Sequence, residues 1–361
     1  PQQNTIGRRQ RQMCIRDRIK RDHEAKRASY STTKKQSLLS FGEAVRRAES
    51  LRFDTTTVHI PAQLGVQVLE NYPLTSLLDT IDWMPFFNAW EFSGRFPDIL
   101  NDPIKGVEAK KLFTDAQAML ERIADEGWLE ARAVFGLFPA YSDENRVVIL
   151  DPQSGEPLET THWLRQQKPM PDGKPQLSLS DFVAPNSSEV TDYIGAFTVT
   201  AGHGIDQYVN AFEDAHDDYS AIMLKALADR LAESFAEHLH RRVRTEFWGY
   251  ASDESLSNDE LIREHYRGIR PAPGYPACPD HREKETLFRL LDVERKIGVS
   301  LTESMAMIPT ASVSGFYFGH PDARYFNLGK IKSDQLEAYA DARSEATDES
   351  RRWLAPVLES E

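Results

Sequence analysis

The sequence GIRPAPGYPAC at residues 268–278 combines side chains suited to binding a small molecule. Arg270 is a fork-shaped donor that matches a carboxylate, and Tyr275 offers a flat face with a polar tip. Gly268 and Gly274 are expected to let a ligand approach the main chain. Prolines fix the backbone before a ligand arrives, which lowers the ordering cost of binding. A ligand with a carboxylate, an ammonium group and an aromatic ring suits this set, although a rigid connection between helices also explains the prolines.

Other motifs that carry chemistry are weak in this chain. AGHGID at 201–206 lacks the third glycine of a dinucleotide-binding fingerprint and predicts a turn. His238 and His240 lie two positions apart on a predicted helix, whereas paired metal ligands lie four apart, so both are expected on the helix surface. AHDDY at 215–219 is explained by a helix start without a metal ion. The sequence also lacks a G-x-S-x-G elbow and a P-loop.

Composition indicates an ordinary globular protein. The chain has 361 residues, of which 40% are hydrophobic and 27% charged, and it is long enough to bury a large core. Cys14 and Cys278 provide neither a disulfide framework nor a zinc-ligand spacing, and Cys278 is expected to be a packed thiol. No apolar run approaches the roughly 18 residues of a membrane span, so we expect a cytoplasmic location and no membrane partner.

The charge is distributed unevenly along the chain. Residues 1–36 contain eleven Lys/Arg and three Asp/Glu, a net charge of +8, so the remainder carries −21 of the total of −13. Such an acidic body argues against a nucleic-acid partner, because phosphate binding depends on lysine and arginine. Residues 1–18 have almost no apolar periodicity. They are predicted to be disordered, and a non-native origin is left open.

The hydrophobic pattern predicts a connector at 19–58, with short helices, and a compact domain at 59–361. Strands and helices alternate irregularly rather than as βαβ units, which favours an α+β fold. The longest predicted helix carries an apolar stripe of Ile222, Leu224, Leu227, Leu231, Phe235, Leu239, Val243 and Phe247, with Asp217 as its N-cap. Helices are predicted at 115–129, 217–248 and 283–298, and strands at 131–142, 145–151, 193–202 and within 305–320.

Eight segments resemble, in order, the C-terminal activation domain of cobalamin-dependent methionine synthase. The resemblance covers about residues 59–356; residues 19–58 are more loosely similar to the preceding linker, and residues 1–18 do not match. The segments are IDWMPFF (81–87), GVEAKKLFTDAQAML (106–120), VFGLFPA (134–140), LSDFVAP (179–185), DYIGAF (192–197), HDDYSAIMLKALADRLAE (216–233), RPAPGYPACP (270–279) and LTESMAMIPTASVSGFYFGHPDARYF (301–326).

The resemblance implies a curved single α+β domain with a long twisted antiparallel sheet flanked by helices. It also implies binding of S-adenosylmethionine and docking on the cobalamin-binding domain of the same enzyme, or of a separate subunit. There, an electron from flavodoxin or an equivalent reductase and the methyl group of S-adenosylmethionine would convert cob(II)alamin to methylcobalamin. No acid, base, nucleophile or metal is required of this domain, because its task is to position the methyl group.

The same resemblance implies a set of ligand residues. Arg270 would hold the methionyl carboxylate, Asp82 would pair with a donor such as the ammonium group, and the backbone of Ala272 would present its polar groups. Tyr275 or Tyr325 would lie against the adenine or the sulfonium. The complete expected set is Asp82, Arg270, Ala272, Tyr275, Tyr325 and Phe326, with Glu233 and Glu264 as further lining residues.

Two alternatives to this function remain from the sequence. One is a free-standing S-adenosylmethionine-dependent methyltransferase, which would need an acceptor pocket. The other is a domain that only docks on a cobalamin protein. The chain has no Asp-x-His-x-x-Gly cobalamin motif and no zinc-binding cysteines. We therefore expect it to bind S-adenosylmethionine without completing a methionine synthase turnover by itself.

Overall fold

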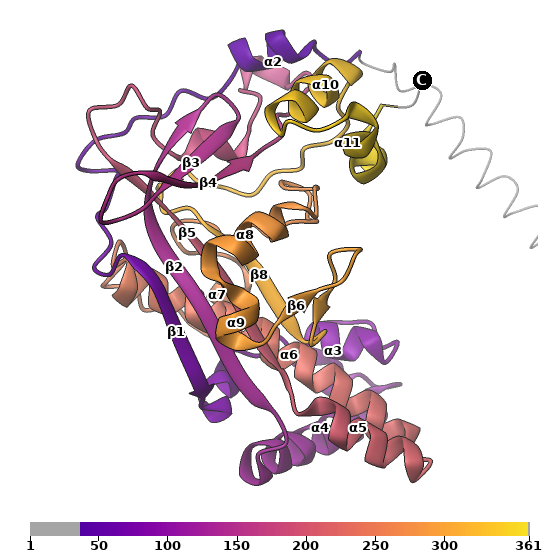
Figure 1. The fold of residues 1–361 in the computed structure, drawn as a ribbon. Coiled ribbons are helices and arrows are strands. Elements are labelled where there is room, and N and C mark those ends of the chain that lie inside the picture. The colour runs from indigo at the N-terminus through magenta and orange to yellow at the C-terminus, as the bar shows by residue number, and fades with distance from the viewer. Residues whose placement is uncertain (1–36, 360–361) are drawn as a thin grey trace, which may run out of the picture.

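The computed structural model describes residues 37–359, so the predictions for residues 1–18 and 19–36 lie outside the described residues. Six strands form one sheet in the order β4-β3-β2-β5-β8, with β1 also paired to β2, and every pair is antiparallel (Figure 1). With helices on both faces, the sheet confirms the expected α+β class. The strands are β1 (Gly65–Tyr72), β2 (Glu130–Asp143), β3 (Arg146–Leu150), β4 (Pro157–His162), β5 (Asp192–His203) and β8 (Ser312–Tyr317).

The long strand β2 gives the sheet its length. On one edge its first part pairs with β1 and its last residues with β3, while its other edge pairs with β5 from Glu130 to Ala140. The middle of β2 is buried on both faces, because helices cover the sheet from both sides. A separate small sheet contains β6 (Ser300–Leu301) and β7 (Met307–Ile308).

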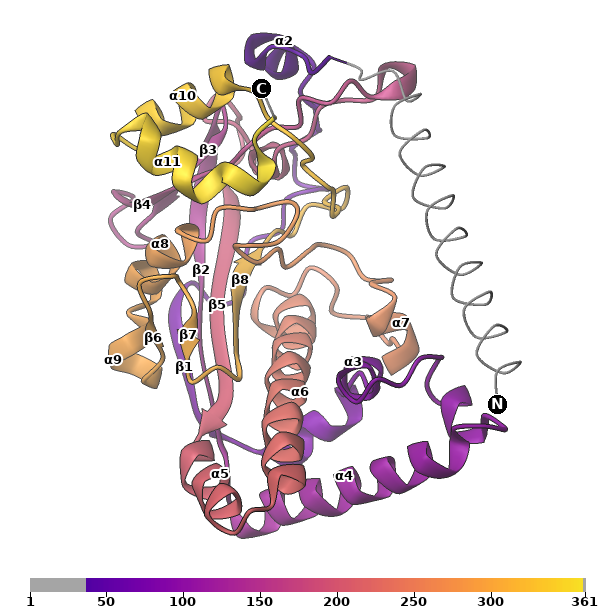
Figure 2. The same cartoon turned by 90° about the vertical axis from the view of Figure 1, so that its right-hand side faces the viewer.

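Helices cover the two faces of the sheet. Helix α6 (Asp218–Arg242) packs on β5 and β8, whereas α8 (Glu283–Leu291) and α9 (Val293–Ile297) lie on the opposite face (Figure 2). Each face has its own apolar core. The remaining α-helices are α2 (Phe41–Arg46), α3 (Met84–Ala89), α4 (Gly106–Glu126), α5 (Ile205–Asp214), α7 (Asn258–Ile262), α10 (Ser333–Ala342) and α11 (Thr347–Leu354).

Helix α6 largely follows the predicted pattern. Asp217 caps it by accepting a hydrogen bond from the Ser220 amide at 3.0 Å. Leu224 and the later stripe residues up to Val243 are buried, but Ile222 is exposed and its assignment to the stripe was wrong. Two helical positions correspond to about 200°, so Ile222 and Leu224 face opposite sides. The α-helix ends at Arg242, and a π-helical turn continues it over Val243–Phe247.

The prediction that His238 and His240 lie on the helix surface was wrong, because α6 is covered on several sides. His238 forms a 2.8 Å hydrogen bond with the hydroxyl of Tyr72 at the end of β1. His240 is completely buried and stacks on Tyr317 of β8. The single helix predicted at 283–298 is two helices in the structure. Asp292, with a φ of 55°, separates α8 from α9.

Replacement of His238 by glutamine is expected to weaken the acid sensitivity of the fold. Burial, followed by Arg241 and Arg242, lowers the pKa of His238 from 6.5 to about 4. The unfolded chain therefore binds a proton that the folded chain does not, and wild type loses stability as pH falls from 6.5 toward 4. Between pH 7 and pH 5, wild type should therefore lose about 1 kcal/mol more free energy of unfolding than the variant, after allowance for solvent screening. Urea unfolding of both proteins at the two pH values measures this loss. Equal losses in the two proteins would contradict the prediction.

Residues 37–58, the described part of the predicted connector, pack on the domain. The Leu39 amide donates to the Gln167 carbonyl at 2.8 Å, and the Phe41 amide donates to the Asp334 carboxylate at 2.7 Å. The domain boundary at residue 59 stays a prediction.

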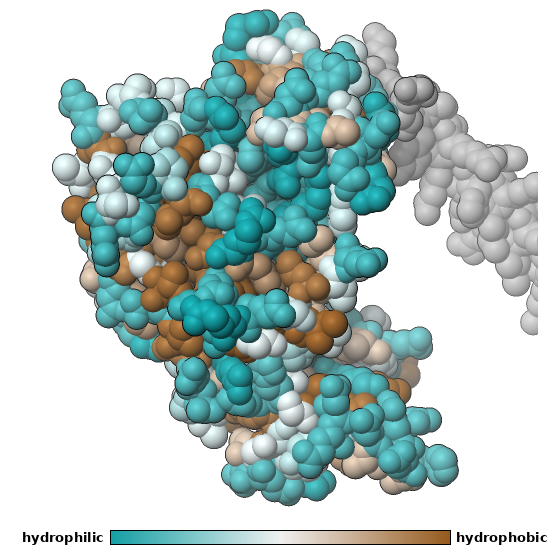
Figure 3. All heavy atoms as spheres, viewed as in Figure 1, coloured by the Kyte–Doolittle hydropathy of each residue, from teal (hydrophilic) through white to brown (hydrophobic). Residues whose placement is uncertain are grey.

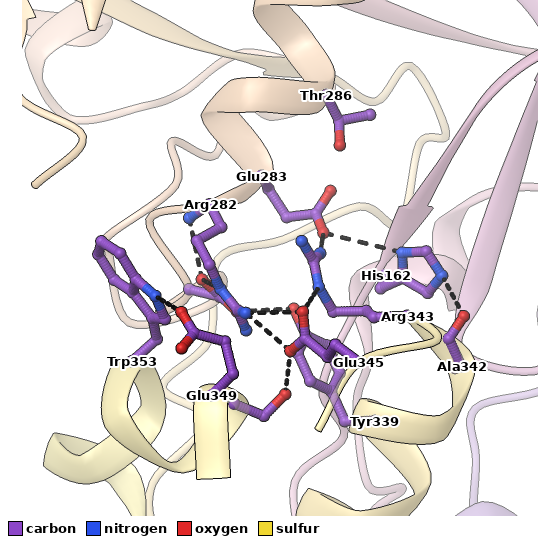
Figure 4. Close-up of polar contacts among 12 residues, drawn as sticks. His162, Arg282, Glu283, Thr286, Tyr339, Ala342, Arg343, Glu345, Glu349 and Trp353 are labelled. Carbon is purple, nitrogen blue, oxygen red and sulfur yellow. Dashed lines mark hydrogen bonds and ion pairs between the residues drawn. The ribbon is translucent and has the colours of Figure 1, made fainter. Parts of the chain in front are cut away.

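The C-terminal helices are attached by a small core and a buried ionic cluster. Leu336 and Leu354 belong to the apolar core beneath α10 and α11. Arg282, beside α8, pairs with Glu345 at 2.7 Å, and Arg343 pairs with Glu283 (Figure 4).

The outline of the molecule is hollowed on the right of Figure 3, between the C-terminal helices and the end that carries α3 and α6. Within residues 37–359, no helix is long and apolar enough to cross a membrane.

Candidate functional site

The loop at 268–279 is held rigid by backbone hydrogen bonds as well as by its prolines. The Phe316 amide of β8 donates to the Pro271 carbonyl at 3.0 Å. Within the loop, the Gly274 amide donates to the Cys278 carbonyl at 2.7 Å, and the Cys278 amide donates to the Tyr275 carbonyl at 2.9 Å. Cys278 is buried, which confirms it as a packed thiol. The loop is therefore fixed to the sheet edge and closed on itself.

The two loop glycines serve packing rather than ligand approach. Gly268 has a φ of 82°, and a Cβ there would lie 2.5 Å from the Tyr250 hydroxyl. Gly274 has a φ of 98°, and a Cβ there would lie 2.2 Å from the His281 ring. Both positions thus require glycine because protein atoms approach them, which corrects the expected role of these residues.

A cavity of about 540 Å³ lies beside the loop, within the usual size range of ligand pockets. A second cavity of about 310 Å³ adjoins it, and the two share Glu233, Glu264 and Arg270. Asp82 lines the second cavity. The first is lined by the other predicted residues, Glu233, Glu264, Arg270, Ala272, Tyr275, Tyr325 and Phe326, and by Phe197, Pro271, Pro276, Ala277, Val313 and Asn327. The fold thus brings all eight predicted residues together, although they come from positions as distant as 82 and 326.

Several of these residues also have local structural contacts. The Asp82 carboxylate accepts a hydrogen bond from the Met84 amide at 3.0 Å at the start of α3. The Tyr325 hydroxyl accepts from the Arg270 amide at 2.9 Å, and the Ala272 carbonyl accepts from the Tyr275 amide at 3.2 Å. Tyr275 itself is 62% exposed at the cavity wall. Its exposure leaves the ring available to a ligand.

The guanidinium of Arg270 is engaged on one side only. Its Nη1 lies 2.7 Å from a carboxylate oxygen of Glu237 and donates to the Tyr266 hydroxyl at 2.7 Å. Among residues 37–359, Nε and Nη2 have no hydrogen-bond partner. The pKa of Arg270 is raised, because Glu237 and Tyr266 outweigh the effect of burial. The side chain therefore stays charged, and it lines both cavities.

Four carboxylates line the second cavity around this cation, and one of them, Glu237, is its ion-pair partner. Asp82, Glu233 and Glu264 all belong to the lining of the second cavity. Partial burial raises the pKa of Glu264, whose backbone is held in the left-handed region at a φ of 56°. A strained non-glycine backbone of this kind is common at functional sites. One arginine edge and several carboxylates suit a ligand that carries both a carboxylate and positive charge.

Several residues of this region were not predicted from the sequence, among them Phe197, Val313, Asn327, Glu237 and Tyr266. Phe197 falls in a strand predicted at 193–202, but alternation alone did not indicate which residues would face a cavity. Val313, Asn327, Glu237 and Tyr266 gave no signal, since their roles depend on which elements pack together. Within residues 37–359, no group of His, Cys, Asp and Glu side chains is arranged to hold a metal ion.

Comparisons with known proteins identify the family of this chain. Residues 73–344 match the family model described as the vitamin B12 dependent methionine synthase activation domain. The crystal structure of the MetH reactivation domain bound to AdoHcy is 48% identical, with a TM-score of 0.86, and the match covers 90% of this chain and 99% of that one. The chain therefore belongs to the family of activation domains of vitamin B12-dependent methionine synthase.

Proposed function

We propose that this activation domain binds S-adenosylmethionine in the two adjoining cavities. The proposal depends on one observation: Arg270, four carboxylates and several aromatic side chains line one continuous region, and among residues 37–359 Nε and Nη2 of Arg270 have no hydrogen-bond partner. S-adenosylmethionine combines a carboxylate with an ammonium group, a sulfonium and an adenine ring. The related reactivation domain bound to AdoHcy supports a ligand of this chemical class.

Each part of the ligand has a matching group in the chain. We assign the carboxylate to Nε and Nη2 of Arg270, which form a planar two-donor edge. Asp82, Glu233 and Glu264 supply negative charge for the ammonium and sulfonium groups. The aromatic walls suit adenine, which stacks on flat π faces; they are Phe197, Tyr275, Tyr325 and Phe326.

The ligand would supply an activated methyl group, and the residues of this chain would bind and orient it. Such positioning needs no acid, base or nucleophile from the domain. We propose the cobalamin-binding domain of the same enzyme, or of a separate subunit, as the docking partner and flavodoxin or an equivalent reductase as the electron source, in the cytoplasm. Methyl transfer from 5-methyltetrahydrofolate to homocysteine would then belong to the whole synthase, with cobalamin and zinc held outside this chain.

Isothermal titration of the 361-residue chain with S-adenosylmethionine tests this function. We expect saturable binding that weakens at least about fivefold in Tyr275→Ala, because an aromatic contact is worth about 1 kcal/mol beyond its buried area. Tyr219→Ala is the matched control, since Tyr219 is 43% exposed and contacts Trp90 and Asp115 instead of the cavities.

The same titration separates the alternatives. A folded wild-type chain that does not bind S-adenosylmethionine would leave docking as the better account of the domain. Methylation of a small acceptor in the absence of cobalamin would instead favour a free-standing methyltransferase. Equal affinities of wild type and Tyr275→Ala would remove the loop from the binding site.

A further inference from the structure

The Nη1 atom of Arg270 contacts two hydrogen-bond acceptors, Tyr266 and His240, and one ion-pair partner, Glu237. Glu237 and Tyr266 each place an oxygen 2.7 Å from Nη1, and His240 Nδ1 lies 3.4 Å from the same atom. Glu237 and His240 are three positions apart on α6 and so share a face of the helix. Tyr266 comes from the segment between α7 and the proline loop. One guanidinium nitrogen is thereby held by two separate parts of the chain.

Glu237, Tyr266 and His240, the three partners of Nη1, are themselves held in place. Glu237 is 8% exposed and His240 is completely buried. The His240 ring stacks on Tyr317 with ring centroids 5.1 Å apart and meets the Tyr266 ring edge-on at 5.0 Å. Such packing restricts the rotamers of these side chains, so Nη1 has a fixed set of partners.

Charge makes Glu237 distinct among the three. Burial, followed by Arg244 and Arg270, holds the pKa of His240 well below its usual range, so this ring is neutral. Its Nδ1 faces the donor Nη1 and must accept, which places the ring proton on Nε2. Tyr266 contributes a neutral hydroxyl. Of the three partners of Nη1, Glu237 is therefore the one that balances the arginine charge.

Without Glu237, Arg270 would have other carboxylates to pair with. Glu233 and Glu264 line both cavities beside it, and Asp82 lines the second. An arginine turned toward them would lose its free edge and would neutralise the groups assigned to the ammonium and sulfonium. A fixed pair with Glu237 prevents both effects.

We propose that Glu237 is a positioning residue for the ligand carboxylate: it holds Nη1 of Arg270 on the buried side, so that Nε and Nη2 face the cavity. This proposal rests on the proposed binding of S-adenosylmethionine. Glu237 also lines the second cavity, but the role proposed for it is to act through Arg270. Its effect should therefore depend on whether the ligand carries a carboxylate.

The test compares S-adenosylmethionine with decarboxylated S-adenosylmethionine, which keeps the adenine, sulfonium and amine. The ratio of the two affinities, measured by titration of the full chain, reports the carboxylate contact alone. In Glu237→Ala we expect this ratio to fall at least tenfold through weaker binding of S-adenosylmethionine, with the decarboxylated ligand changed less than threefold. Glu237→Gln keeps the size of the side chain but removes the charge that pairs with Arg270, so we expect the ratio to fall in this variant as well, at least threefold.

Controls separate this positioning role from a purely structural one. Glu246→Ala breaks an Arg–Glu pair at 2.8 Å near the end of α6, where Glu246 is half-exposed, and should leave the ratio unchanged. If Glu237→Ala fails to fold, Tyr266→Phe removes another acceptor of Nη1 and should lower the ratio at least threefold. Equal weakening of both ligands, or an unchanged ratio in the folded variants, would overturn the proposal. A wild-type chain that binds neither ligand would instead overturn the proposed function on which it rests.

Discussion

Replacement of Arg270 by alanine is expected to weaken S-adenosylmethionine binding at least 100-fold. The variant loses the planar donor edge assigned to the ligand carboxylate. It also leaves Glu237, a buried carboxylate 2.7 Å from the guanidinium in wild type, without this partner. Truncating one member of a buried charge pair costs about 2–5 kcal/mol, and about 2.7 kcal/mol corresponds to 100-fold in affinity.

The lysine variant separates charge from geometry at the same position. Arg270→Lys keeps the positive charge beside Glu237 but replaces the planar fork with a single ammonium group. We expect it to bind with an affinity between those of wild type and Arg270→Ala. Titrations at one ionic strength, with circular dichroism to confirm folding, measure these affinities. An Arg270→Ala chain that is folded and binds within threefold of wild type would exclude Arg270 as the carboxylate partner.

Much of the fold was predictable because its main elements carry strong local patterns. The strands β2 and β5 are long apolar runs, and both were predicted within two residues of their observed ends. The cap at Asp217 and the end of α9 at Gly298 also follow from local chemistry. Such features depend on neighbouring residues, so a single sequence contains them.

What could not be predicted depends on contacts between distant elements. His238 and His240 have the polarity of surface residues, yet Tyr72 and Tyr317 bury them from different sides of α6. Gly268 and Gly274 suggested an open backbone, but Tyr250 and His281 fill the space beside them. Spacing along one helix or loop cannot show which neighbours will cover it.

At the candidate site, too, some residues could be predicted from the sequence and others could not. Resemblance to the family indicated Arg270 and seven other residues, all of which line the two cavities. It gave no indication of Glu237, which has no motif of its own and acquires its place only when α6 packs beside the proline loop. The buried partner of a binding residue is thus harder to predict than the residue itself.

Replacement of Arg282 by alanine is expected to lower the free energy of unfolding by about 3–5 kcal/mol. The Arg282 side chain is 6% exposed and lies 2.6 Å from the carboxylate of Asp280. It also lies 2.7 Å from the carboxylate of Glu345 (Figure 4). Asp280 directly follows the proline loop, and Glu345 lies between α10 and α11. Without the arginine cation, the two neighbouring carboxylates repel each other and lose their shared positive partner. This destabilisation falls at the junction between the C-terminal helices and the loop.

An exposed arginine provides the control for this estimate. Arg289 pairs with Glu159 at 2.9 Å but is 58% exposed, so Arg289→Ala should cost no more than about 1 kcal/mol. Urea unfolding of the two variants and wild type at pH 7 measures the difference. Equal costs for Arg282→Ala and Arg289→Ala would mean that the buried cluster does not hold the C-terminal helices. A large cost confined to Arg282→Ala would mean that these helices help to fix the base of the loop that carries Arg270.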